Sequence, residues 1–168
     1  MRYSDEDRGP VFNIDENSYV FARPRVCGRN GKETAHGVQV VLTGLERIDG
    51  DLPPLSRLVL GRPLKWSDVE SNQAEVPPGV CRAFDLVHVR RLPRDAPTKE
   101  ANYPGALDVF PKRPIDGHRI PEGVYDLAVA LVARDLPSQF FSFRVTIVKP
   151  QRDGGLLDES VLAVQLQE

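Results

Sequence analysis

The chain has 168 residues, enough for one domain with a sizeable core and more than a single β-sandwich of about 100 residues needs. Its 22 Lys and Arg against 24 Asp and Glu give a net charge of −2, which excludes the basic surface typical of nucleic-acid-binding proteins. No apolar run approaches the ~20 residues of a membrane span, and the charged first residues are unlike a signal peptide. We therefore expect a cytoplasmic protein, or a fragment of a larger or membrane-anchored one.

The first half of the chain predicts strands separated by turns. Residues 1–10 are polar and charged and predict a flexible tail. Residues 19–27 and 37–45 alternate apolar with polar side chains, the pattern of a half-buried strand. Pro24 has no amide hydrogen to donate, so the first of these strands should have an edge or a bulge there. The single Trp, Trp66, is expected in the core.

The second half has stronger strand patterns. Residues 81–90, 125–133 and 140–148 are rich in β-branched and aromatic residues, and 125–133 alternates most regularly. Residues 158–166 fit either a short helix or a last strand, and Asp158 as a possible N-cap favours the helix.

Strands separated by turns, with almost no helical periodicity, predict an all-β protein. We expect an immunoglobulin-like antiparallel β-sandwich of about 7–9 strands over residues 11–150. Residues 1–10 would then be a flexible tail, and residues 151–168 a C-terminal tail or short helix.

Two similar segments lead into predicted strands, VPPGV at 76–80 and IPEGV at 120–124. In each, the Pro suits position i+1 of a tight turn, and the Gly tolerates the positive φ that follows. The two segments are predicted to be turns that deliver the chain into a sheet.

These motifs carry a resemblance. Residues 120–133 resemble the PxGxYxLxVxV strand of bacterial immunoglobulin-like and fibronectin-like modules. Residues 25–42 are similar to the VxNxGxxxAxxVxVxL hairpin of the CARDB-like group, named for bacterial cell-adhesion-related domains. The chain departs from that pattern at Gly28, where the group prefers Asn, and at Pro24. The resemblance covers residues 19–148 and implies a sandwich that serves as an accessory module, without catalytic residues.

Cys27 and Cys81 are the only cysteines. In the predicted alternation Val26 and Leu86 belong to the buried faces of their segments, which places both cysteines on outer faces. Two outward cysteines on different strands are not expected to join across a core. This predicts two free thiols in a reducing compartment.

The search for chemistry finds no catalytic motif, phosphate-binding loop or metal-ligand spacing, so we expect no catalytic residues, metal site or cofactor. His36, His88 and His118 are scattered along the chain and are expected in loops or at the surface.

The candidate binding residues are Arg23, Arg25, Arg90, Arg91 and Tyr103. The arginines could form a basic face for an acidic partner or a phosphate, or simply a solvated sheet face. Tyr103 could belong to an aromatic loop rim, or anchor its loop to the sandwich.

The leading functional hypothesis is a non-enzymatic binding or structural module that mediates protein–protein interaction through a sheet face, a loop or a sheet edge. The alternative is an accessory carbohydrate-binding β-sandwich, which an aromatic strip on a flat face would favour. A third possibility is an enzyme whose site is assembled from distant residues.

Overall fold

The computed structural model describes residues 2–3, 19–30, 32–90, 102–110, 118–150 and 159–167. These residues form strands and two short 3-10 helices, η2 (Pro54–Val59) and η3 (Glu159–Val161), which confirms the predicted all-β class. The strands are β1 (Arg2–Tyr3), β2 (Tyr19–Ala22), β3 (Arg25–Cys27), β4 (Ala35–Arg47), β5 (Lys65–Trp66), β6 (Ala74–Val76), β7 (Cys81–Asp85), β8 (Val87–Arg90), β9 (Gly105–Leu107), β10 (Arg119–Ile120), β11 (Gly123–Val132), β12 (Gln139–Ile147) and β13 (Leu162–Gln167).

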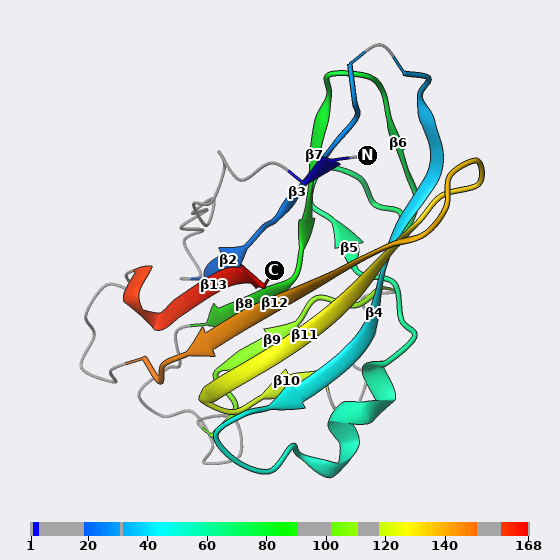
Figure 1. The fold of residues 1–168 in the computed structure, drawn as a ribbon. Helices are drawn as coiled ribbons and strands as arrows, with labels where there is room; N and C mark the ends of the chain where they lie inside the picture. The colour runs from blue at the N-terminus through cyan, green and yellow to red at the C-terminus, as the bar shows by residue number, and fades with distance from the viewer. Residues whose placement is uncertain are drawn as a thin grey trace.

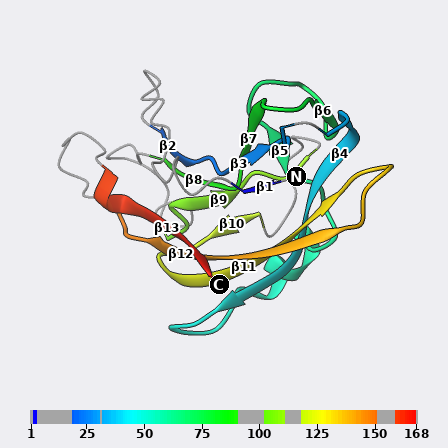
Figure 2. The ribbon, with the colours of Figure 1, turned by 45° about the horizontal axis from the view of Figure 1, so that its top comes forward.

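The strands lie in two facing layers (Figures 1 and 2). One layer has the order β13-β12-β11-β4-β6. The other combines β1-β3-β7-β5 with β10-β9-β8-β2, because β2 runs on into β3 and β7 runs on into β8 with only short interruptions. These interruptions, and several strands of two or three residues, bring the number of strands above the predicted 7–9.

The two layers are joined along one side by the segment 61–66. Leu64 donates its amide hydrogen to the carbonyl of Val40 in β4, and the Lys65 amide donates to the carbonyl of Asp108, in the other layer. On the opposite side β13 lies beside β2 (Figure 1). Backbone hydrogen bonds therefore join the two layers along one side of the sandwich. On the other side, the edge strands β13 and β2 of the two layers lie next to each other.

The predicted irregularity at Pro24 is a bulge. Ala22 pairs with Val87 and Arg25 pairs with Ala83, so three residue steps on one strand face four on the other. The Pro24 carbonyl accepts a hydrogen bond from the amide of Phe84. A residue without an amide hydrogen is tolerated because the ladder is already interrupted there.

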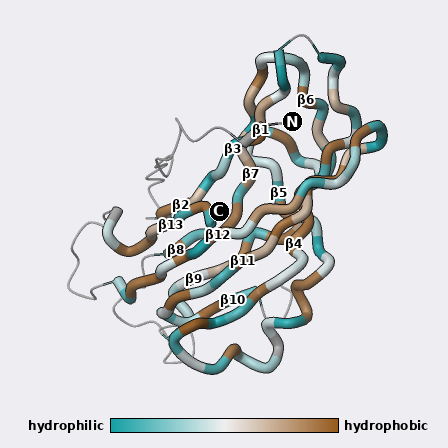
Figure 3. Tube along the Cα trace, in the orientation of Figure 1, coloured by the Kyte–Doolittle hydropathy of each residue, from teal (hydrophilic) through white to brown (hydrophobic). Residues whose placement is uncertain are grey.

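The core lies between the layers, and its side chains come from alternate strand positions, as predicted. Along the strands, apolar and polar residues follow one another (Figure 3). Trp66 is fully buried and packs edge-on against Phe84, which confirms its predicted core position. The largest buried side chains are Trp66, Tyr125, Phe84, Phe143, Leu42, Leu64, Leu86, Leu107, Ile120 and Leu127. Both layers contribute to this set, so neither sheet buries its apolar face alone.

The C-terminal segment is a strand, and the predicted short helix is wrong. β13 pairs antiparallel with β12 from Leu162↔Ile147 to Gln167↔Ser142, after the single turn η3. Leu162, Val164 and Leu166 alternate with polar or small residues, which suits the inner face of an edge strand. Pairing with β12 over all six residues, together with burial of the alternate apolar side chains, outweighs the cap expected at Asp158. At the other end of the chain, Arg2–Tyr3 pair with β3 within the segment predicted to be a tail.

The two Pro-x-Gly segments differ in structure. In 76–80, Gly79 has φ +73° and the Val80 amide donates to the Pro77 carbonyl, which makes the predicted tight turn with Pro78 at i+1. Gly123 has φ +150° and is already the first residue of β11. One sequence pattern thus delivers the chain into a sheet by two backbone routes.

The segment that resembles the CARDB-like hairpin does not form a hairpin. β3 pairs with β1 and β7, whereas β4 pairs with β11 and β6 in the other layer. The connection over residues 28–34 therefore crosses between the layers. The alternation of its two strands is compatible with either arrangement, because both bury one face of each strand.

Candidate functional site

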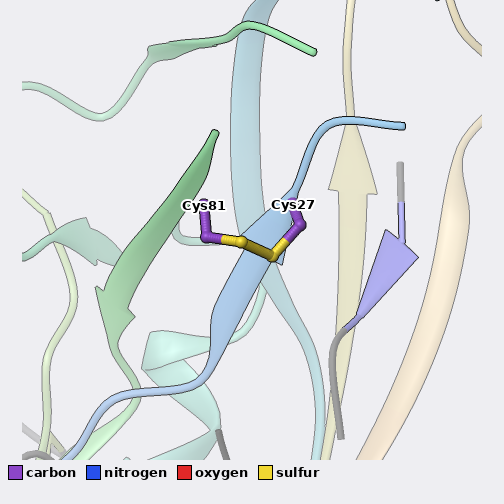
Figure 4. Close-up of a disulfide and its surroundings, with 2 residues drawn as sticks. All are labelled: Cys27 and Cys81. Atoms are coloured by element: carbon purple, nitrogen blue, oxygen red, sulfur yellow. A yellow bond between two sulfur atoms is a disulfide. The ribbon is translucent and has the colours of Figure 1, made fainter. Parts of the chain in front are cut away.

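Cys27 and Cys81 form a disulfide between the neighbouring strands β3 and β7 (Figure 4). They are directly opposite in register, with Cα atoms 4.0 Å apart. The Gly28 amide donates to the Val80 carbonyl just beyond them, which makes the cysteines a non-hydrogen-bonded pair, the type that brings cross-strand side chains closest.

The prediction of two free thiols is therefore wrong, although the predicted outward placement is right: Cys81 is exposed and Cys27 half-buried. Side-chain alternation excludes a bond across the core. It does not exclude one between neighbours on the same face of one sheet. Because the cysteines are bonded, they no longer indicate a reducing compartment.

Just beyond the disulfide two loops lie against each other. The Gly79 amide donates to the Gly28 carbonyl at 3.1 Å, and a Cβ atom on Gly28 would lie 2.1 Å from the Pro77 carbonyl oxygen. Only glycine permits this approach. The disulfide and these backbone contacts together form the tip of the sandwich.

A pocket of about 570 Å³ opens beside this tip. One wall is the segment after the disulfide, and the other is the turn between β11 and β12. The lining residues are Gly28, Arg29, Lys32, Glu33, Thr34, Ala35, Val76, Asp135, Leu136, Pro137 and Gln139. Two basic and two acidic side chains among them balance, so the pocket does not select a ligand of one charge sign.

The β11–β12 hairpin exposes apolar side chains next to the pocket. Phe140 is 73% exposed, Leu136 38% and Val132 37%. Phe140 pairs with Ala130, which pairs with Val41, so the three side chains form a row on the outer face of the sheet.

Arg23 is held within the structure. Its Nε atom is 2.6 Å from a carboxylate oxygen of Asp85, and its guanidinium lies 4.2 Å from the centre of the Phe21 ring. Asp85 is 3% exposed and also accepts a hydrogen bond from the Ser67 hydroxyl. These contacts favour the interpretation of Arg23 as a structural residue.

Arg25 and Arg90, two of the other predicted binding residues, are not brought together. Arg25 is opposite Ala83, whereas Arg90 is opposite Tyr19, six residues earlier on the same strand path, or about 20 Å along it. Arg91 lies outside the described residues.

Tyr103 is half-buried and lies close enough to Tyr125 to contribute to raising its pKa. Its neighbour Pro104 accepts a hydrogen bond from the Arg90 amide at 3.2 Å, so Tyr103 lies between the surroundings of β11 and the end of β8.

A cluster of aromatic and histidine side chains on the outer face of β2 and β8 was not predicted from the sequence. The His88 ring lies 5.1 Å from the Phe21 ring and 5.4 Å from the Tyr19 ring, centre to centre. His88 Nδ1 is 2.8 Å from a carboxylate oxygen of Asp108. Alternation indicates that Tyr19 and Phe21 face outward, but only the strand register shows that His88 lies opposite Phe21.

Tyr125 lies near the start of β11, at the end of the strand away from the β11–β12 turn. Its hydroxyl donates to the Pro121 carbonyl at 2.8 Å, and burial raises its pKa to about 12. The Arg47 guanidinium lies 5.8 Å from its ring centre and pairs with Asp49, whose pKa is lowered by that hydrogen bond.

No protein-family model matches the chain, and no curated protein or solved structure matches it either. Within the ranges that the structure describes, neither helical segment has the length or hydrophobicity needed to cross a membrane.

Proposed function

We propose that the protein is a non-enzymatic interaction module that binds a protein partner at the tip of the sandwich. The observation that carries this proposal is Phe140, which projects 73% exposed from the β11–β12 hairpin. A large aromatic side chain in water is unfavourable unless a partner covers it, and aromatic anchors dominate binding energy at protein interfaces. Leu136 and the adjacent pocket extend the apolar surface and offer a recess for a partner side chain.

We further propose that the sandwich is of the immunoglobulin-like kind. The Tyr125 side chain supports this, because a tyrosine near the start of a strand that bonds a carbonyl a few residues upstream is a feature of such sandwiches. Immunoglobulin-like modules commonly present their loops and hairpins as binding surfaces. The exposed hairpin tip agrees with that use.

A photo-crosslinking amino acid at position 140, used in the native host, would identify the partner. The affinity of the purified pair is then measured for the wild type and for Phe140→Ser. We expect a loss of about 30-fold or more, which corresponds to an interface hot spot. Val148→Ser is the matched control, since Val148 is 48% exposed and lies at the other end of β12. Equal affinities for the wild type and Phe140→Ser would refute the proposal.

The second candidate is carbohydrate binding at the Tyr19–Phe21–His88 cluster. Rings flanked by Arg23 and Asp108 combine apolar faces with hydrogen-bonding groups, as sugar recognition requires. The Tyr19 and Phe21 rings are inclined by 38°, and Tyr19 and His88 by 77°, so they do not form one flat platform; this places the candidate second. Micromolar binding on a glycan array, lost in Tyr19→Ala and retained in Phe140→Ser, would promote it.

A further inference from the structure

We propose that the Cys27–Cys81 disulfide is a reversible redox bond, which a dithiol reductant opens in the folded protein and which controls the mobility of the tip. This inference concerns the tip itself and does not depend on the partner proposed above.

The bond is accessible to a reductant. Cys81 is exposed and Cys27 is half-buried, and both lie on the outer face of the sheet. A thiolate of the reductant attacks one sulfur and forms a mixed disulfide, while the other cysteine leaves as a thiolate and takes up a proton. The second thiolate of the reductant then displaces the first cysteine, which is also protonated. Two electrons pass to the cysteines, and the reductant leaves as a disulfide. Exposed disulfides are the ones most open to this exchange.

The sheet does not need the bond to stay paired. Beneath the cysteines, Val26 and Phe84 are buried in the core and hold β3 and β7 in register. The Gly28–Val80 backbone hydrogen bond at 3.0 Å continues the ladder on the far side of the pair. Reduction therefore removes a covalent link from the surface of a sheet whose other face remains packed.

The tip depends on the bond more than the sheet does. Past Gly28 the chain leaves β3 for the loop that forms one wall of the pocket, and Val76 contributes from the segment that leads to Cys81. On that side of the disulfide, the described backbone ties between the two loops are the bonds of Gly28 with Gly79 and Val80, and the pairing of Ala35 with Val76 where β4 and β6 meet. Reduction is thus expected to loosen residues 28–35 and 76–80 and to widen the pocket.

The test treats the purified native protein with dithiothreitol, without denaturant, and follows thiol content and hydrogen exchange by mass spectrometry. We expect both cysteines to become alkylatable and, at labelling times of minutes, exchange to accelerate several-fold in residues 28–35 and 76–80 while β11 and β12 stay protected. A Cys27→Ser/Cys81→Ser variant should show the same fast exchange at the tip, insensitive to the reductant. Thiols released only after unfolding, loss of protection in β11 and β12 at these short labelling times, or a double-Ser variant that fails to fold would each overturn the proposal.

Discussion

Replacement of Arg23 by Met should destabilise the fold if Arg23 is a structural residue. If Arg23 only binds a partner, the replacement should leave stability unchanged. Met keeps most of the apolar stem of Arg but removes the guanidinium. The Asp85 carboxylate, 3% exposed, would then keep only the Ser67 hydroxyl as a described side-chain partner. A buried carboxylate without its counter-charge is costly because the protein interior solvates it poorly.

The expected loss is about 3.5–4 kcal/mol. Removing one partner of a buried ion pair costs about 3–5 kcal/mol, and the lower end applies because the Arg23 side chain is 15% exposed and water reaches the pair from that side. The contact with the Phe21 ring adds about 0.5–1 kcal/mol.

Urea unfolding followed by tryptophan fluorescence measures this loss, since Trp66 is buried in the core. Arg57→Met is the matched control: Arg57 is exposed on η2 and its replacement should cost less than about 0.5 kcal/mol. Adding Asp85→Asn to Arg23→Met should recover part of the loss, because the buried group is then neutral. If Arg23→Met is as stable as Arg57→Met, the structural role assigned to Arg23 is wrong.

Three further predictions concern the tip and β11. The Cys27→Ser/Cys81→Ser variant should lose about 4 kcal/mol in urea unfolding, from the 54-residue separation of the cysteines, and a loss under 1 kcal/mol would contradict this. Gly28→Ala should cost about 1–3 kcal/mol, because its Cβ meets the Pro77 carbonyl; wild-type stability would contradict the observed approach. The pKa of Tyr125 is raised to about 12 in the fold, above the value of about 10 in the unfolded chain. The contribution of the Tyr125 hydroxyl to the free energy of unfolding is thus complete below pH 10, and it falls by about 2–3 kcal/mol between pH 10 and 12. Tyr125→Phe should unfold with a weaker dependence on alkaline pH, and an unchanged dependence would refute the assignment.

Part of the candidate site follows from local patterns. Alternation of buried residues along β3 and β12 indicates that Cys27 and Phe140 point outward, since side chains on a strand alternate between its two faces. Alternation does not say which outward side chains remain exposed. Phe140 is 73% exposed, whereas Arg23 is covered by its partner Asp85, 62 residues away.

The sequence by itself determined the all-β class, the buried faces of β4 and β11, the core position of Trp66 and an irregularity at Pro24. Each of these depends on the period of a strand or on the missing amide hydrogen of proline, which are properties of a short stretch of chain. The tertiary structure alone decided the Cys27–Cys81 bond, the pairing of His88 with Phe21 and the choice of strand over helix for β13. These features depend on which strands become neighbours and in what register. The sequence pattern of one strand does not show which distant strand it will pair with.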